Sequence, residues 1–238
     1  MKKRLTFMAA VLALVLSSVG VGAQQQAQST ISVNERAERI PNLDKLVTEL
    51  KQYHDCTCKC GCYAHDLDLQ ADRAIAILRQ RAAHRNSKEK LAVVLDIDET
   101  SLSNYQEMLE NGFVFNKKVF DAWVETAQAP AIPGSLRIDK EAARLGVAVF
   151  FITGRPDSER AATENNLHAQ GFNYQQLTLR PDSALKESVG AFKSDARAQI
   201  VAEGYKIVLN VGDQWSDLKG GPEAEFSVKY PDPYYYLP

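Results

Sequence analysis

The sequence predicts an α/β fold built on a doubly wound, Rossmann-like parallel sheet, and three features of the chain carry this prediction. Residues 91–95, 147–152 and 206–211 are short, mostly apolar runs with the length and composition of buried strands. Polar residues follow each run directly or after one glycine, and stretches with helical spacing lie between the runs. Because ligands bind at the carboxyl ends of the strands in such a sheet, these polar residues are the candidate functional residues.

The composition is that of a globular protein. The chain has 238 residues, of which 45% are hydrophobic and 24% are charged, enough for one α/β domain with an insertion or appendage. The formal net charge of -2 gives no electrostatic case for binding a nucleic-acid polymer. No oligomeric state is predicted from these features.

The first 23 residues have the three-part pattern of a secretory signal peptide. A basic start at residues 1–4 precedes a mostly apolar run, and small residues end the segment at Ala23. The alternative is an uncleaved membrane anchor, because the apolar run approaches spanning length. Small residues near its end favour cleavage after Ala23, so we expect a secreted or periplasmic protein with no stable membrane anchor. A polar N-terminal segment, 24–41, would follow.

A helical extension is predicted over residues 42–90, before the first strand. Residues 42–53 carry leucines and a valine at helical spacing, and Asn42 is placed to cap this helix. A second helix is predicted from about residue 66 to residue 85, with one apolar face. We expect both helices to pack against the core.

All four cysteines lie in the turn between these two helices, at every second position: Cys56, Cys58, Cys60 and Cys62. In an oxidising compartment an even number of cysteines favours disulfides, although neighbours two apart pair only with strain. A thiolate site for zinc or copper, assisted by His54 or His65, is a second interpretation, and free thiols are a third. Nothing ties this segment to phosphate chemistry.

The first strand ends in Asp96-Ile97-Asp98-Glu99-Thr100, with three carboxylates within four residues. Aspartates at alternate positions of a strand point the same way, so Asp96 and Asp98 repel one another unless a cation or a shared proton relieves the charge. The alternative is an ordinary polar strand end and turn.

An insertion over residues 105–132 is predicted to form a small, partly helical cap after the first strand. Asn116 can cap a helix with an apolar stripe, which is more typical of packing than of substrate binding. A helix follows from Pro133-Gly134, and Gly146 is suited to end it.

The second strand ends in Thr153-Gly154-Arg155. A hydroxyl and a glycine at a strand end can bind a phosphate oxygen through the side chain and the backbone N–H groups. Arg155 either adds charge near the site or is a solvated loop residue, which is the favoured interpretation. A helix over 158–170 and a shorter third strand over 174–179 complete this half.

The fourth strand ends in Gly212-Asp213, and Asp217 comes one helical turn later. Asp213 would leave the sheet where the first two aspartates converge, and Asp217 would support the residues that line the site without lining it itself. The tail, 229–238, contains three prolines and is expected to be an extended strap.

Taken together, these motifs resemble those of the haloacid dehalogenase (HAD) superfamily of phosphohydrolases. VVLDIDETSLSN, TGR and GDQWSDL are similar to the forms in its secreted acid phosphatases, the class B and class C acid phosphatase and plant vegetative-storage-protein group. The family's third motif needs one lysine, for which Lys186 and Lys193 compete. Lys193 is favoured, because AFKSDAR resembles the family pattern and a helix over 196–203 would place it near a helix N-terminus. The resemblance implies a HAD-like phosphatase core over 91–238.

The resemblance also implies a mechanism for hydrolysing small phosphomonoesters. Asp96 would be the nucleophile, forming an aspartyl-phosphate, and protonated Asp98 would be the general acid and then the base. The Asp96 and Asp213 carboxylates and the Asp98 backbone carbonyl would hold Mg²⁺. Phosphate would be bound by Thr153, Gly154 and Lys193, with Thr100 fixing the Asp98 side.

In such families a segment after the first motif supplies aromatics to the substrate, and the candidates here are Tyr105, Phe113, Phe115 and Trp123. The competing hypothesis is a non-catalytic protein on the same fold, either storage-like or metal-binding. Storage relatives can lack the nucleophile, which this chain has. Phosphotransfer to an alcohol shares every motif and stays open.

Overall fold

A computed structural model describes residues 40–58 and 62–237. The chain divides into two compact units, Met1–Ile40 and Pro41–Pro238, and every element below belongs to the second. The predicted signal peptide, nearly all of the polar segment and Cys60 lie outside the described residues. Within the described residues, no helix is both long and apolar enough to cross a membrane.

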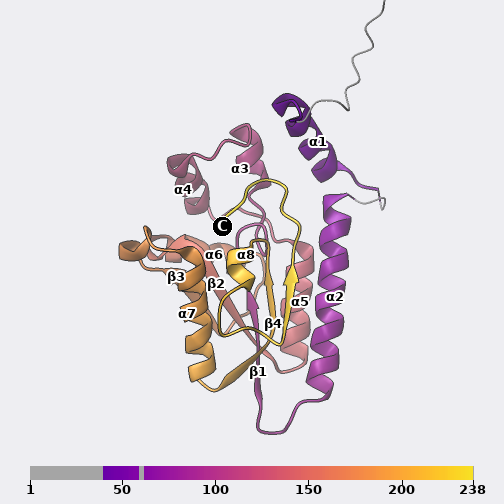
Figure 1. The fold of residues 1–238 in the computed structure, drawn as a ribbon, viewed down its shortest axis with the longest axis vertical. Coiled ribbons are helices and arrows are strands. Elements are labelled where there is room, and N and C mark those ends of the chain that lie inside the picture. Colours follow the sequence, from indigo (N-terminus) through magenta and orange to yellow (C-terminus); the bar gives the residue numbers. More distant parts are fainter. Residues whose placement is uncertain (1–39, 59–61, 238) are drawn as a thin grey trace, which may run out of the picture. The chain divides into compact units, whose positions relative to one another are not determined.

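Five parallel strands form one sheet in the order β3-β2-β1-β4-β5 (Figure 1). The strands are β1 (Lys90–Leu95), β2 (Ala148–Pro156), β3 (Gln176–Arg180), β4 (Tyr205–Gly212) and β5 (Phe226–Lys229). The chain builds outward from β1 to β3 and then returns to the other side of β1 for β4. The strand order therefore reverses between β1 and β4, and this is where a doubly wound sheet binds its ligands. The predicted fold class is confirmed, while β5 was missed.

Helices connect the strands and flank the sheet. They are α1 (Leu43–Asp55), α2 (Tyr63–Ala83), α3 (Tyr105–Glu110), α4 (Lys117–Glu125), α5 (Pro133–Arg144), α6 (Arg160–Ala169), α7 (Val189–Ala202) and α8 (Trp215–Leu218), with 3₁₀ turns η2 (Asp157–Glu159) and η3 (Asp182–Ala184). Gly146 and Gly171 follow α5 and α6 with positive φ, as residues that end helices commonly do.

The core lies on both faces of the sheet because side chains alternate along each strand. Leu91, Val93 and Leu95 of β1 belong to the larger apolar cluster, with residues of α2, α5 and α6. Ala92 and Val94 belong to a second cluster on the other face, with residues of α7. Burial on both faces explains why β1 is a continuous apolar run.

The N-terminal helix packs against the core less than predicted. Asn42 caps α1 as predicted, with its side chain accepting from the Asp44 N–H. However, no residue of α1 is buried, and Leu43 is 72% exposed. The apolar spacing therefore identified the helix correctly, and Tyr53 near its C-terminal end packs against the core cluster.

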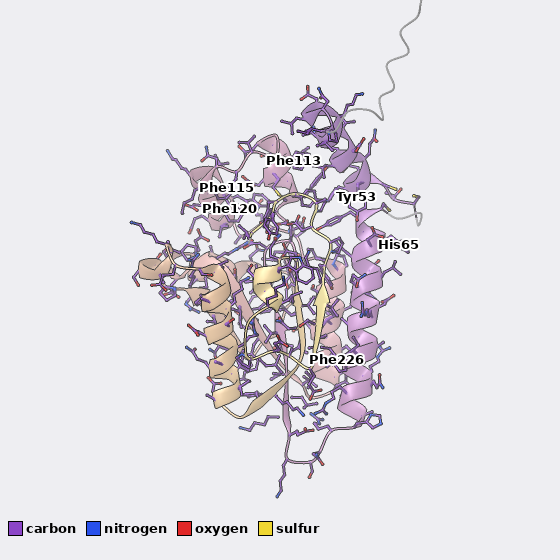
Figure 2. All side chains as sticks on the ribbon, viewed as in Figure 1. Tyr53, His65, Phe113, Phe115, Phe120 and Phe226 are labelled. Carbon is purple, nitrogen blue, oxygen red and sulfur yellow. The ribbon has the colours of Figure 1, made fainter. Side chains whose placement is uncertain are left out.

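The insertion forms two short helices, α3 and α4, at the end of the sheet toward which the strands run. Figure 2 shows Phe113, Phe115 and Phe120 together on this cap, away from Phe226 at the start of β5. Asn116 caps α4 as predicted, accepting from the N–H groups of Lys118 and Val119. The cap thus lies on the same side as the strand ends that carry the candidate site.

Helix α7 begins earlier than the sequence predicts. Ser188 caps it through the Ala191 N–H, so the helix starts at Val189 rather than at residue 196. Lys193 consequently lies in the second turn, and its proximity to a helix N-terminus no longer argues for an anion site.

Candidate active site

The site forms where β1 and β4 end side by side. Asp96 follows β1 and Asp213 follows β4, and the Asp96 N–H donates to the Val211 carbonyl at 3.1 Å. Both carboxylates are buried. Parallel pairing of the two strands therefore brings together aspartates that are far apart in the sequence.

Lys193 supplies the positive charge between the carboxylates. Its Nζ lies 2.5 Å from Asp96 Oδ1 and 2.5 Å from Asp217 Oδ1, and all three residues are buried. Burial alone would lower the pKa of Lys193, but the charges of Asp217 and Asp96 outweigh it and raise the pKa. Lys186, the competing candidate, is exposed in the loop before α7.

The negative charge of the cluster exceeds what Lys193 neutralises. Burial, followed by the charge of Asp217, raises the pKa of Asp96 well above its usual range. Burial and the charges of Asp217 and Asp232 raise the pKa of Asp213 to about 7. A divalent cation would relieve this repulsion.

Three carboxylates of this cluster, those of Asp96, Asp213 and Asp217, can reach a common metal ion, because their oxygens lie within 4.8 Å of one another. Oxygen-only donors suit Mg²⁺. This set includes Asp217, which the sequence predicted only as a supporting residue. The Asp98 side chain is directed to other partners.

Thr100 contacts Asp213 rather than Asp98. Its hydroxyl donates to Asp213 Oδ1 at 2.8 Å, and the Gln214 amide donates to Asp213 Oδ2 at 2.7 Å. The prediction that Thr100 fixes the Asp98 side is corrected accordingly, and Thr100 orients the β4 aspartate instead.

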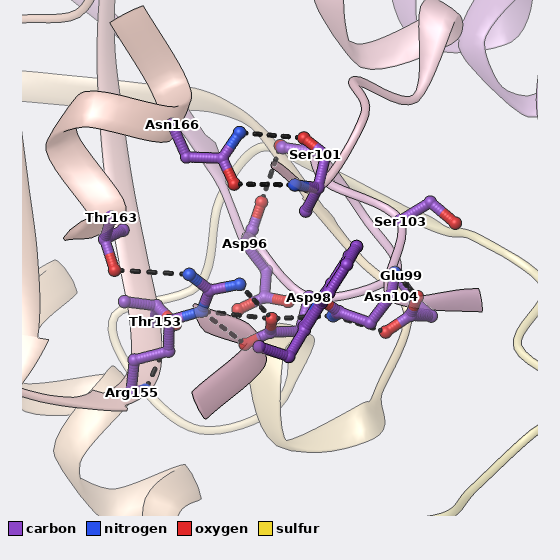
Figure 3. A network of polar contacts seen from close by, with 12 residues as sticks. Asp96, Asp98, Glu99, Ser101, Ser103, Asn104, Thr153, Arg155, Thr163 and Asn166 are labelled. Atoms are coloured by element: carbon purple, nitrogen blue, oxygen red, sulfur yellow. Dashed lines mark hydrogen bonds and ion pairs between the residues drawn. The ribbon is translucent and has the colours of Figure 1, made fainter. Parts of the chain in front are cut away.

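Asp98 is held by a buried arginine, as Figure 3 shows. Arg155 donates from Nη2 to Asp98 Oδ1 at 2.7 Å and from Nε to both carboxylate oxygens, and Asn104 Nδ2 donates to Oδ1 at 2.9 Å. Burial tends to raise the pKa of Asp98, but the Arg155 charge and these hydrogen bonds lower it overall. The interpretation of Arg155 as a solvated loop residue is wrong, since its side chain is only 1% exposed.

Thr153 and Gly154 lie at the end of the strand that carries Arg155. The Thr153 hydroxyl accepts from the Arg155 N–H at 3.2 Å, and Thr153 is completely buried. A Cβ on Gly154 would lie 3.2 Å from the Val189 side chain, so this glycine allows the strand to pass close to the start of α7.

The four candidate aromatics of the cap have three different surroundings. Tyr105 stacks on His54, and Phe113 stacks on Tyr234 of the C-terminal tail. By contrast, Phe115 is 76% exposed. Trp123 instead donates its indole N–H to Asn104.

The cysteine segment lies beside this aromatic group. Cys58 takes part in a disulfide, and the sulfur atoms of Cys56, Cys58 and Cys62 lie within 4.8 Å of one another. Asp55, which precedes the segment, accepts a hydrogen bond from the Tyr105 hydroxyl at 3.2 Å.

Sequence reasoning missed Asn104 and undervalued Arg155. A polar residue soon after a strand end gives no local signal that distinguishes a site residue from a turn residue. The one available signal was charge. The carboxylates that follow the first strand require hydrogen-bond donors if they are buried, and Arg155 lies at the same edge of the sheet, at the end of the neighbouring strand.

Comparison with known proteins places these features in a family. The model of the HAD superfamily, subfamily IIIB (acid phosphatase), matches residues 15–238. Acid phosphatase 1 of Solanum lycopersicum is 40% identical over 148 residues, covering 60% of this chain and 58% of the relative. Vegetative storage protein 2 of Arabidopsis thaliana is 32% identical over 151 residues, covering 61% of this chain and 56% of the relative. The chain thus spans about three fifths of these curated relatives' lengths.

A solved structure shows a similar fold. The class C acid phosphatase from Bacillus anthracis has a TM-score of 0.66 and 23% sequence identity, with 82% of this chain and 86% of that chain covered. At this identity the similarity concerns the fold alone.

Proposed function

The chain belongs to subfamily IIIB of the HAD superfamily, the acid phosphatases, and we propose on this basis that it hydrolyses small phosphomonoesters. The observation that carries the proposal is the contact of Lys193 with Asp96 at 2.5 Å, next to the buried Asp213. A nucleophilic carboxylate, a fixed ammonium group and further carboxylates within reach of a cation are the parts that phosphoryl transfer needs.

The proposed reaction has two steps. An Asp96 carboxylate oxygen attacks phosphorus, the bond between phosphorus and the ester oxygen breaks, and Asp98 gives its proton to the departing alcohol. A water molecule then attacks the phosphorus of the aspartyl-phosphate and gives a proton to Asp98. The phosphate leaves and Asp96 is regenerated. Partial exposure of the Asp98 carboxylate, 19%, supports its role in exchanging protons with substrate and water.

The phosphoryl oxygens would be bound by three residues. Lys193 offsets the charge that the oxygens share with Asp96, while the Thr153 hydroxyl and the Gly154 N–H orient them. The same groups would serve phosphotransfer to an alcohol, in which the acceptor replaces water.

Mg²⁺ is the proposed cofactor. The Asp96 and Asp213 carboxylates and the Asp98 backbone carbonyl would hold it, with Asp217 close behind. The ion would supply positive charge to the phosphoryl group as charge moves toward the leaving oxygen. The raised pKa values of Asp96 and Asp213 support this assignment, because burial and the charges of neighbouring carboxylates disfavour the ionised forms in the absence of a cation.

The proposed location is secreted or periplasmic, after cleavage of the signal peptide behind Ala23. The mature protein would then meet small phosphomonoesters outside the cytosol. The basic start, the apolar run and the small residues of the first 23 residues support this proposal.

A chromogenic phosphomonoester assay tests the proposed function. The purified mature protein should release p-nitrophenol from p-nitrophenyl phosphate, lose activity with EDTA and recover it with Mg²⁺. Lack of activity across a panel of phosphomonoesters at acid and neutral pH would contradict the proposal. Full activity after exhaustive chelation would contradict the metal requirement only.

A storage-like role is the second candidate, and the similarity to vegetative storage proteins favours considering it. The same assay separates the two functions, because a storage protein without catalytic activity would not hydrolyse the ester. Retention of Asp96, Asp98, Lys193 and Asp213 supports the enzyme.

A further inference from the structure

Asn104 occupies a position between the proton-donating carboxylate and the cap. Asn104 is 1% exposed, and its amide Nδ2 donates to Asp98 Oδ1 at 2.9 Å and to Glu99 Oε2 at 2.9 Å. Its amide oxygen accepts from the Trp123 indole N–H at 2.9 Å. Every hydrogen-bonding atom of the side chain is therefore used, as Figure 3 shows for the carboxylate side.

Trp123 and the two carboxylates together fix the orientation of the Asn104 amide group. An indole N–H can only donate, so it requires the amide oxygen as its acceptor, and carboxylates accept from the amide N–H groups. Trp123 belongs to α4 of the cap, whereas Asn104 is the last residue of the first motif. The amide orientation of Asn104 is thus fixed by the two carboxylates on one side and by the cap helix on the other.

The hydrogen bonds on Asp98 are distributed unequally between its two oxygens. Oδ1 accepts from Arg155 Nη2 at 2.7 Å, from Arg155 Nε at 3.1 Å and from Asn104. Oδ2 accepts only the weaker contact from Arg155 Nε at 3.2 Å among the described residues. Oδ1 is therefore saturated, and Oδ2 keeps the lone pair that can carry the transferring proton.

From this geometry we propose that Asn104 is a positioning residue for the leaving-group step, and that Trp123 couples the cap helix to it. Asn104 and Arg155 clamp Oδ1 from two sides and direct Oδ2 to the leaving oxygen, while the Trp123 indole holds the Asn104 amide in the required orientation. The proposal deepens the proposed function and rests on it.

Two substrates that differ in their need for a proton test this role. The p-nitrophenolate ion leaves readily without protonation, whereas the alkoxide of benzyl phosphate requires a proton from Asp98. Both substrates carry one aromatic ring. Asn104→Ala should lower kcat for benzyl phosphate about tenfold or more beyond any loss for p-nitrophenyl phosphate, with KM little changed.

Trp123→Phe is the second variant, because it keeps the ring and removes only the indole N–H. It should change the ratio of the two kcat values in the same direction by a smaller factor. Asn111→Ala is the matched control: this cap asparagine bonds to Glu107 and should leave the ratio unchanged. Thermal unfolding of each variant identifies any loss of folding, and if Asn104→Ala does not fold, the Trp123→Phe ratio decides.

Equal losses on both substrates, or a change in KM alone, would overturn the positioning role while leaving the phosphatase intact. A wild-type protein that hydrolyses neither ester would overturn the proposed function and this inference with it.

Discussion

At the scale of single residues, the account depends on carboxylates whose different surroundings give them different roles. Asp96 lies against Lys193, Asp98 against Arg155, and Asp213 against Thr100. The arginine lowers the pKa of one carboxyl, while burial and like charges raise the pKa of the other two. Pairs of acids with pKa values moved apart are typical of acid–base and nucleophilic sites.

Asp96→Asn should abolish turnover, with kcat falling about a thousandfold or more, because an amide cannot form the acyl-phosphate. Thermal unfolding should show an unchanged or higher Tm, since one buried charge is removed. Asp44→Asn, at an exposed position of α1, is the control and should retain full activity. Near-normal turnover of Asp96→Asn would reject the nucleophile.

The raised pKa of Asp213 predicts how stability depends on pH when no metal is bound. Between its unfolded value of 3.8 and its folded value of about 7, the folded state binds more protons, so this group destabilises the fold as pH rises. In EDTA, the Tm of Asp213→Asn relative to wild type should therefore increase from pH 5 to pH 8. A Tm difference between the variant and the wild type that is constant across this pH range would contradict the raised pKa of Asp213.

The lowered pKa of Asp98 predicts an acidic optimum. The proton donor is required in its protonated form, which is populated only as pH falls toward a pKa below the usual range. The profile of kcat/KM against pH, measured with saturating Mg²⁺, should peak below neutrality, and a maximum above pH 7 would count against Asp98 as the acid.

At the scale of elements, the close approach of α5 to α2 depends on Gly134. A Cβ at this position would lie 2.7 Å from the Ala71 Cβ, closer than such atoms pack, and would make a tight contact of 3.2 Å with the Tyr230 hydroxyl. Gly134→Ala should destabilise the protein by about 1–3 kcal/mol, measured by urea unfolding.

Gly190→Ala is the matched control, since Gly190 also lies in the first turn of a helix, α7. Its Cβ would meet ordinary contacts at 3.7 Å, so stability should be unchanged or slightly higher. Equal destabilisation of the two variants would argue that glycine flexibility, rather than helix packing, matters at residue 134.

Elements were predictable where local patterns determine them, and less so where packing does. The apolar runs identified β1, β2 and β4, and Asn42 and Asn116 marked helix starts correctly. The start of α7 was missed because Gly190 in its first turn has a low helix propensity. The exposure of α1 was missed because helical spacing gives a helix an apolar face without supplying a surface to cover it.

At the scale of the molecule, the proximity of the site residues was predictable, because parallel strands present their carboxyl ends at one edge of the sheet. This argument placed Asp96, Asp98 and Asp213 together. The role of Asn104 and the contact of Thr100 became clear only from the structure, because Trp123 of the cap and Asp213 after β4 are distant from them in the sequence. Strand β5 escaped prediction because Phe226–Lys229 is short and half polar, and it becomes a strand only by pairing with β4.

The site also links metal binding to the stability of the whole molecule. A ligand present at about 100 times its Kd stabilises the folded state by about 2.7 kcal/mol. Mg²⁺ should raise the Tm of the wild type at pH 8, less at pH 5, where Asp213 must first lose a proton. Asp213→Asn should show little or no rise. A wild-type Tm that does not change on addition of Mg²⁺ at either pH would contradict the metal assignment.

The most direct test of the central claim is to trap the phosphorylated chain during turnover. Wild-type protein mixed with p-nitrophenyl phosphate and quenched in acid should carry one phosphoryl group, which peptide mass spectrometry should locate on Asp96. A phosphoryl group on another residue, or turnover that yields no phosphorylated chain at any quench time, would contradict it.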